Sequence, residues 1–338
     1  MIHFDVTKSG TSRHRSGLMR LNARLRDELG AAAREVRWPA WDRAVRTADW
    51  FLTAELFSET ERPGFTAFLE SHPCRLAAIF NDAIPLKHPH ITWPQSVARH
   101  PGYMKLLARF DRVWAISDAS RRELVEFWQW QGLERTPPVD VLVLGADFNA
   151  QPRVTFRPPS SVLSLLSIGI LEPRKNQMFL LDVCGDLWAE GMAFELHVVG
   201  RVNPHFGAAI VARIKALRRK YPACLRYHPA ASDAVVAGLY ATARATAFPT
   251  LAEGCGLPPL ESLWMGVPCV CSDLPVLREN TNGGGCVSVP LNDREAWKAA
   301  LRRVLSDDAF HARLTAEATS RPLPRWADAA QTMLRSLG

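Results

Sequence analysis

The stretch Ala245–Ser272 alternates strand and helix signals within a short span, and this order restricts the fold of the whole chain. Its first part, Ala245–Pro249, is apolar and predicts a buried strand. A loop with two glycines follows, then a helix that begins at Leu257 or Pro258 and ends at Met265, then a second apolar strand. Strands joined through a helix pair in parallel, so we expect an α/β protein built on parallel sheets.

The loop of this segment carries groups that suit a phosphorylated ligand. Gly254 and Gly256 allow a ligand to approach the backbone closely, and N–H groups at the helix start attract phosphate. Glu253 lies in the loop and Glu261 lies about one turn into the helix, so both carboxylates can face one crevice. A carboxylate accepts two hydroxyl hydrogen bonds, which suits a ribose diol and a sugar. The alternative is two surface glutamates that flank a helix start.

The rest of the chain repeats the alternation of strands and helices on both sides of a proline-containing linker. At 338 residues the chain suits two domains of about 150–170 residues each. Residues 151–161 hold three prolines and are typical of a linker. We therefore predict a first domain over residues 1–152, a second over 153–320 and a terminal helical segment over 321–338.

Composition excludes several classes of protein. No apolar run approaches the roughly 18–20 residues that span a bilayer, and the start MIHFDVTKSG lacks the apolar core of a signal peptide. The seven cysteines are scattered and include no C-x-x-C pair, so we expect reduced thiols in a cytoplasmic protein. The ten histidines include no H-E-x-x-H, and we predict no metal site.

The net charge of +7 indicates an anionic partner. The sequence shows no zinc-finger spacing, RNP-type strand or helix-turn-helix signature, so we predict no nucleic-acid binding. Arg20 and Arg24 lie one turn apart on one face of a predicted helix. We interpret them as a patch for an anionic membrane surface or a phosphorylated acceptor, and the alternative is a solvated helix face.

Four ordered segments resemble the retaining glycosyltransferases of family 4, which have the GT-B fold. Leu163–Asn176 is similar to that family's strand and G-x-x-x-x-R-K-N loop, and Glu253 with Glu261 matches its E-x7-E signature. Phe194–Arg201 and Ser232–Gly254 lie between them in the family's order. The resemblance is strong from about Ser160 to Ser306. It implies two Rossmann-like domains facing a central cleft, and a terminal helix, containing Trp326 and Ala329, that crosses back to the first domain.

The resemblance also implies roles for individual residues. Arg174 and Lys175 would hold the donor's diphosphate and stabilise the leaving group, Glu261 would bind the ribose, and Glu253 would contact the transferred sugar. The base would lie near Tyr227–Pro229. The further residues assigned to donor binding are Gly17, Gly169, His228, Gly254, Gly256 and Leu257.

Asp82 follows a predicted strand in a stretch similar to the family's H-D-x-I-P, so we include it among the candidate catalytic residues. The alternative is a turn or helix-capping aspartate. Asn81 replaces the histidine of that stretch, and Cys255 stands where the family commonly has an aromatic residue. The role of an imidazole therefore does not carry over, and the resemblance does not determine the shape of the donor pocket.

The sequence thus predicts a metal-independent retaining hexosyltransferase without a resident cofactor. Its donor would be a GDP- or UDP-linked sugar, with mannose as one candidate. Its acceptor would be a surface polysaccharide or a lipid-linked saccharide, reached from the cytoplasm at the inner face of the membrane. The R-K-N loop together with E-x7-E argues against an epimerase of the same fold, and a glycogen-type phosphorylase needs a much longer chain. The remaining alternative is a degenerate GT-B protein that binds anionic membranes or partners without catalysis.

Overall fold

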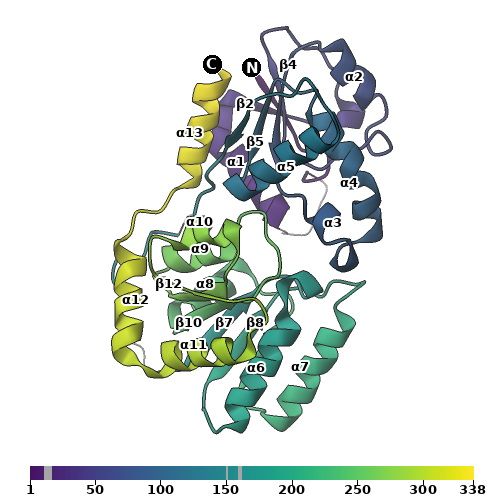
Figure 1. Ribbon diagram of the computed structural model, residues 1–338. Coiled ribbons are helices and arrows are strands. Elements are labelled where there is room, and N and C mark those ends of the chain that lie inside the picture. The colour runs from purple at the N-terminus through teal and green to yellow at the C-terminus, as the bar shows by residue number, and fades with distance from the viewer. Residues whose placement is uncertain (11–16, 150, 159–161) are drawn as a thin grey trace. The chain divides into compact units, whose positions relative to one another are not determined.

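A computed structural model describes residues 1–10, 17–149, 151–158 and 162–338 (Figure 1). The chain divides into two compact units. Unit 1 comprises residues 1–145 and 324–338, and unit 2 comprises residues 146–323. No helix among the described residues is both long enough and apolar enough to cross a membrane.

Unit 1 is built on a sheet of six parallel strands in the order β2-β1-β3-β4-β5-β6. Ile2 of β1 pairs with Ala33 of β2 on one side and with Trp50 of β3 on the other. The strand order therefore reverses between β1 and β3: β2 lies on one side of β1, and all later strands lie on the other. The strands are β1 (Ile2–Asp5), β2 (Ala33–Val36), β3 (Trp50–Thr53), β4 (Arg75–Phe80), β5 (Arg112–Ala115) and β6 (Val139–Val141).

The helices of unit 1 bury apolar side chains at helical spacing. In α1, Leu21, Leu25 and Leu29 are buried one turn apart. The helix α5 is capped by Ser117, whose hydroxyl accepts the N–H of Ser120. The α-helices are α1 (Gly17–Leu29), α2 (Phe65–Ser71), α3 (Ile84–Lys87), α4 (Pro94–Leu107), α5 (Asp118–Trp130) and α13 (Trp326–Leu337), with 3-10 turns at η1 (Gly30–Ala32), η2 (Trp38–Ala40) and η3 (Pro89–Ile91).

The terminal helix α13 belongs to unit 1, where it packs against α1 (Figure 1). The indole of Trp50 on β3 donates a hydrogen bond of 2.7 Å to the carbonyl of Leu337. A Cβ atom at Gly145 would lie 2.2 Å from the backbone nitrogen of Trp326, so only glycine allows this approach. Two distant segments of the chain therefore close the first unit.

Unit 2 also has six parallel strands, in the order β12-β11-β10-β7-β8-β9. Its first strand, β7, lies in the middle of the sheet and pairs with β8 and β10. The chain builds one half of the sheet outward from β7, then crosses over and builds the other half from β10. The strands are β7 (Ser164–Ile168), β8 (Glu195–Val199), β9 (Leu225–His228), β10 (Ala245–Phe248), β11 (Cys269–Ser272) and β12 (Cys286–Val289).

The helices of unit 2 cover this sheet. Leu187 of α6, Ile214 of α7 and Trp297 of α11 share one buried apolar cluster with β7 and β8, while α9 packs against β10 and β11. Ser232, Asp293 and Asp307 cap α8, α11 and α12 with their side-chain oxygens. The helices are α6 (Gln177–Ala189), α7 (Ala208–Lys220), α8 (Asp233–Thr242), α9 (Leu257–Trp264), α10 (Pro275–Thr281), α11 (Arg294–Ser306) and α12 (Asp308–Ser320), with the 3-10 turn η4 (Pro173–Lys175).

Part of the predicted linker is bound to unit 2. Arg153 donates to the carbonyls of Ala318 and Arg321, and the backbone N–H of Val154 donates to Trp264. Arg157 donates to the carbonyl of Ala241. The proline-containing segment is thus held in place where it is described, because its arginines occupy carbonyl groups at the ends of helices.

Candidate functional site

The candidate site lies at the carboxyl ends of β7 and β10, where the strand order of unit 2 reverses. Open parallel sheets bind ligands at such a point, because the loops after the two strands run in opposite directions and leave a crevice. The loop after β7 leads through η4 to α6, and the loop after β10 leads to α9. The N–H of Leu251 donates to the carbonyl of Arg174 at 2.8 Å and ties the two loops together.

Glycines allow the backbone to pass closely at this edge. Gly200, which follows β8, has φ of +149°, and a Cβ atom there would lie 1.9 Å from the carbonyl oxygen of Gly169. Gly169 follows β7, and a Cβ atom there would contact the aliphatic stem of Lys175 at 3.4 Å. The predicted donor-binding residue Gly169 therefore lies against one of the predicted catalytic cations.

Arg174, Lys175 and Glu253 come together as the sequence predicted for one site. Arg174 Nη1 lies 3.0 Å from Glu253 Oε1, and Lys175 Nζ lies 2.6 Å from the same oxygen. The hydroxyl of buried Thr250 lies 2.7 Å from this oxygen as well. Since all these contacts converge on Oε1, the second oxygen, Oε2, has no hydrogen-bond partner among the described residues and remains open to a ligand hydroxyl.

The ion cluster is partly buried, which strengthens its interactions. The exposed fractions of the side chains are 21% for Arg174, 11% for Lys175 and 9% for Glu253. Burial lowers the pKa of Lys175 below its ordinary value, although Glu253 opposes this shift. For Glu253 burial acts to raise the pKa, but Lys175 and Arg174 outweigh it and the pKa lies below its ordinary value. The carboxylate is therefore ionised at neutral pH.

Two further residues contact the cluster, and sequence reasoning missed both. Glu172 accepts hydrogen bonds from Nε and Nη2 of Arg174, at 3.1 and 2.9 Å. Asn203, after β8, donates to the other oxygen of Glu172 at 3.1 Å. Glu172 could have been found from the sequence, because it is an acidic residue two positions before Arg174. Nothing in the local sequence around Asn203 indicates its contact with Glu172.

Glu261 is buried on α9, the helix that follows the site loop. Gly256 begins this helix with φ of +86°, and a Cβ atom there would lie 2.4 Å from Leu277 Cδ2. Pro258 occupies the first turn, as predicted, where its missing N–H costs nothing. Glu261 and Leu257 thus lie on the helix that opens at the site, and Gly254 lies in the loop before it.

Cys255 is buried beside the site loop, and burial raises its pKa to about 12. The thiol is therefore neutral and acts as a small apolar group. Asn280 of α10 donates to the carbonyl of Cys255 at 2.6 Å and fixes the loop.

His228 ends β9, and its Nε2 lies 3.1 Å from Nδ1 of His197. The two rings are stacked, with centroids 5.4 Å apart. Burial, with a smaller contribution from His197, lowers the pKa of His228, so the ring is neutral at neutral pH. A neutral ring suits contact with an uncharged base better than contact with phosphate.

The remaining predicted residues belong to unit 1. Asp82 Oδ1 accepts the N–H of Ile84, two residues further on, at 3.0 Å, which is the turn that the sequence left open as an alternative. Its carbonyl accepts His100 Nε2 at 2.9 Å. Gly17 is the first residue of α1, and a Cβ atom there would meet open space. Residues 11–16, which precede Gly17, lie outside the described residues.

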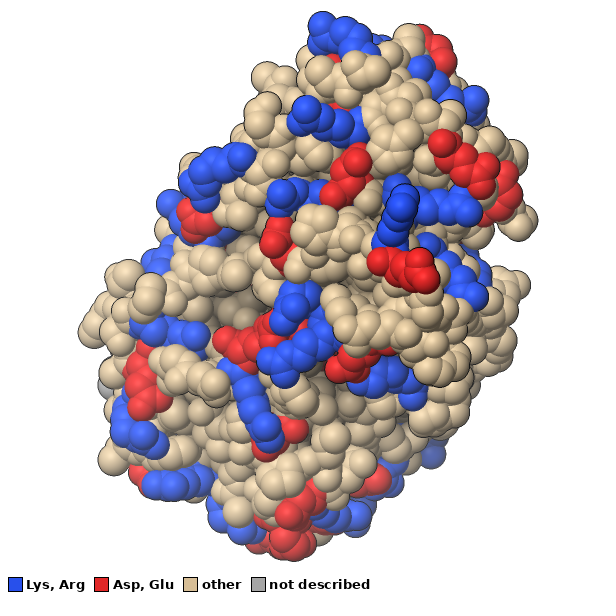
Figure 2. Space-filling view, turned by 45° about the horizontal axis from the view of Figure 1, so that its top comes forward, with Lys and Arg blue, Asp and Glu red and all other residues tan. Residues whose placement is uncertain are grey.

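Basic and acidic side chains lie side by side on the face shown in Figure 2. On α1, Arg24 pairs with Glu28 at 3.4 Å, and the next basic residue, Arg26, pairs with Asp27 at 2.8 Å. Arg20 lies on the same helix. These pairs reduce the local positive charge that a patch for anionic lipid would need.

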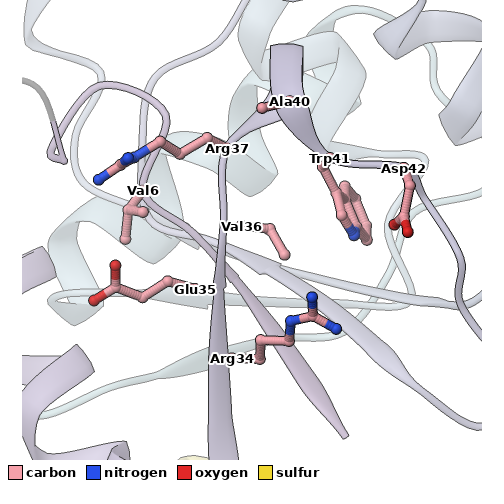
Figure 3. A pocket seen from close by; sticks show the side chains of 8 residues that line it. All are labelled: Val6, Arg34, Glu35, Val36, Arg37, Ala40, Trp41 and Asp42. Carbon is pink, nitrogen blue, oxygen red and sulfur yellow. The ribbon is translucent and has the colours of Figure 1, made fainter.

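A cavity of about 360 Å³ lies in unit 1 beside the edge strand β2 (Figure 3). Arg34, Arg37 and Trp41 are among its lining residues. None of the residues predicted for the donor site lines this cavity. Within the described part of the chain, no group of three or more His, Cys, Asp or Glu side chains is placed to hold a metal ion.

Comparison with known proteins agrees with this geometry. Residues 163–307 match the family model described as Glycosyl transferases group 1. The chain is 28% identical over 259 residues to the serotype-specific mannosyltransferase WbdA of Escherichia coli, a match covering 68% of this chain and 29% of WbdA. It is 30% identical over 220 residues to the O-antigen chain mannosyltransferase B of Escherichia coli, covering 60% of this chain and 54% of the relative. The chain thus spans 29% of the length of the first relative and 54% of the length of the second.

The fold is also similar to that of Anabaena HepE, solved in complex with UDP and glucose. The TM-score is 0.75 with 13% sequence identity, and the match covers 99% of this chain and 98% of HepE. Two six-stranded parallel sheets flanked by helices define a GT-B fold of two Rossmann-like domains, as the sequence predicted. Together the comparisons support a glycosyltransferase.

Proposed function

We propose that the chain is a retaining glycosyltransferase of family 4 that moves a hexose from a nucleotide-diphosphate sugar to a saccharide acceptor. The observation that carries this proposal is the convergence of Arg174, Lys175 and Glu253 at the switch point of unit 2. Two adjacent cations match the charge of a diphosphate. A partly free carboxylate beside them matches the hydroxyls of the sugar that the diphosphate carries.

In this reaction the bond from the sugar's anomeric carbon to the diphosphate oxygen breaks, and its electron pair leaves with the diphosphate. Arg174 and Lys175 stabilise the negative charge that develops there. The acceptor hydroxyl attacks from the same face and passes its proton to the departing diphosphate. Glu253 orients the sugar through Oε2, and its Oε1 faces Nη1 of Arg174 and Nζ of Lys175, which the diphosphate also contacts. Glu261 binds the ribose, and neutral His228 lies near the base.

The relatives indicate the class of sugar and acceptor. WbdA and mannosyltransferase B are named as mannosyltransferases, and the second is named for the O-antigen chain. We therefore propose mannose as the transferred sugar, GDP-mannose as the donor and a surface polysaccharide or its lipid-linked precursor as the acceptor. UDP-linked hexoses are the second donor class. A lipid-linked acceptor would bring the enzyme to the inner face of the membrane, and the proposed reaction uses the two cations in place of a divalent metal.

The first test is a thermal-shift panel of UDP, GDP, ADP and their sugar conjugates. A ligand at about 100 times its Kd stabilises the folded state by roughly 2.7 kcal/mol, a shift of a few degrees. We expect one nucleotide to stabilise the wild type. The same nucleotide should not stabilise Glu261→Ala, whereas it should stabilise the surface variant Arg213→Ala as much as the wild type. That nucleotide's sugar conjugate is then assayed for transfer with a saccharide acceptor. Absence of any shift, together with absence of transfer, contradicts the proposal and favours a binding protein without catalysis.

A further inference from the structure

Glu172 holds one edge of the Arg174 guanidinium. Its Oε1 accepts from Nε at 3.1 Å and from Nη2 at 2.9 Å. The opposite nitrogen, Nη1, donates to the carbonyl of Ala252 and to Glu253 Oε1, both at 3.0 Å. The planar guanidinium is therefore oriented from two sides, with Glu172 behind it and the β10 loop in front.

Glu172 is itself held by Asn203. Its second oxygen, Oε2, accepts from Asn203 Nδ2 at 3.1 Å. The amide of Asn203 has one orientation only, because its Oδ1 accepts the backbone N–H groups of His205 and Phe206 at 3.0 and 3.4 Å. Asn203 is buried, and its own backbone N–H donates to the carbonyl of Leu171. A rigid turn after β8 thus fixes Glu172, which in turn fixes Arg174.

The carboxylates of Glu253 and Glu172 contact opposite edges of the Arg174 guanidinium. Glu253 faces Arg174 and Lys175 together, so a bound diphosphate competes with it for Nη1 and Nζ. The backbone carbonyl of Glu172 accepts the N–H of Lys175, whereas the Glu172 carboxylate contacts Nε and Nη2, on the far edge of Arg174. Its contact can persist when phosphate oxygens approach the near edge.

We propose that Glu172 and Asn203 are positioning residues that keep Arg174 aimed at the diphosphate during transfer. The inference rests on the function proposed above. Under this proposal, buried Asn203 affects the rate of sugar transfer from a different loop, through Glu172 and without contacting the substrate.

The hydrogen-bond pattern defines a rescue experiment. In Glu172→Gln the new amide group would face Nδ2 of Asn203, donor against donor, and Asn203 cannot turn because its oxygen is occupied. In Asn203→Asp the new carboxylate would face Glu172, charge against charge. In the double variant the amide at position 172 donates to the carboxylate at position 203, which still accepts both backbone N–H groups. The chain of hydrogen bonds and the net charge are then both restored.

The test measures kcat and the donor KM for the wild type, both single variants, the double variant and Arg174→Ala. Glu295→Gln, an exposed glutamate of unit 2, is the matched control. We expect each single variant to lower kcat about tenfold, within the range of couplings between contacting residues, with a smaller effect on KM. The double variant should recover to within about threefold of wild type, and the control should be unchanged.

A second readout is independent of catalysis. A charge-assisted hydrogen bond slows exchange of the Arg174 Nε proton with water, which ¹⁵N NMR of the side chain detects. We expect faster exchange in each single variant and slow exchange in the double variant. Thermal unfolding of every variant serves as the folding control, and Asn203→Ala replaces Asn203→Asp if the latter does not fold.

The outcomes separate the two proposals. If the wild type transfers sugar and the single variants match it, the positioning role is wrong. If the double variant is no better than the single variants in both readouts, the coupling between positions 172 and 203 is wrong. If the NMR pattern follows expectation but the wild type transfers no sugar from any nucleotide donor, the hydrogen bonds that link Asn203, Glu172 and Arg174 are supported and the proposed function is wrong.

Discussion

Each of the two sheets has a switch point, and each switch point holds an arginine between two carboxylates. In unit 1, between β1 and β3, Arg62 Nη2 lies 2.6 Å from Asp5 and 2.7 Å from Glu55. In unit 2, between β7 and β10, Arg174 lies between Glu172 and Glu253. The topology and the charges are alike, but the exposure of the arginine differs.

Arg62 is fully buried, at 0% exposed, whereas the Arg174 side chain is 21% exposed. Among the described residues Arg62 Nε and Nη1 have no hydrogen-bond partner, and the guanidinium carbon lies 5.5 Å from the ring centres of Phe57 and Phe65. A buried arginine of this kind cannot reach a ligand and serves the structure of unit 1. Topology alone therefore does not make a functional site, because a ligand also needs access to the charged groups.

Removal of Arg62 should produce the largest effect. Arg62→Met leaves Asp5 and Glu55 buried without their cation, and we expect the free energy of unfolding to fall by roughly 3–5 kcal/mol. Urea unfolding measures this change. Arg109→Ala, which breaks an exposed pair with Glu70, is the control and should cost no more than about 1 kcal/mol. If Arg62→Met lowered the free energy of unfolding as little as the control does, the buried cluster would not stabilise unit 1 as proposed.

Removal of Arg174 should instead reduce activity more than stability. In Arg174→Ala we expect kcat for sugar transfer to fall on the order of 10²-fold, as for a lost oxyanion donor. The unfolding midpoint should change little, since the arginine is partly exposed. Steady-state kinetics with the donor that passes the thermal-shift panel checks this, with Arg213→Ala as control. Full activity in Arg174→Ala would contradict the proposed role of the cation pair.

The two clusters should also respond to acid in opposite directions. The pKa of Glu253 is lowered from its ordinary value of about 4.5, so its stabilising effect is complete above that pH and is lost as pH falls through the folded-state pKa. Burial, with Asp5 beside it, raises the pKa of Glu55, so protonation of Glu55 becomes more favourable in the folded state as pH falls. We expect Glu253→Gln to remove acid sensitivity on the order of 1 kcal/mol and Glu55→Gln not to remove it. The measurement is the free energy of unfolding of the wild type and both variants at pH 7 and pH 4. An equal change in this free energy between the two pH values in Glu253→Gln and Glu55→Gln would contradict the expected difference.

The smallest expected effect concerns the alkaline side of the rate profile. Because burial lowers the pKa of Lys175, the rate should fall with rising pH before an ordinary lysine would lose its proton. In Lys175→Arg the cation persists, so we expect this decline to disappear, with a several-fold lower rate at neutral pH because arginine does not replace the compact ammonium group. A pH–rate profile of both proteins measures the effect. An unchanged alkaline decline in the variant would assign the titration to another group.

Local sequence patterns predicted the strands and helices around the candidate site of unit 2. The strand before Glu253 and the helix after Gly256 lie where periodicity and Pro258 placed them. The cap of α5 does not follow from the sequence, because Ser117, Asp118 and Ser120 all carry suitable oxygens and only the backbone conformation at Ser117 selects one.

The sequence by itself determined the alternation of strands and helices, the loop with Arg174 and Lys175, and the loop with Glu253. Only the tertiary structure decided how these groups meet, because Arg174 and Glu253 are 79 residues apart and become neighbours through the pairing of β7 with β10. The same holds for Asn203, whose loop follows β8. Burial of Arg62 is likewise a property of the folded unit, since nothing in its local sequence distinguishes it from an exposed loop arginine. Spacing along the chain encodes local conformation, whereas strand order and packing decide which charges meet and which of them water can reach.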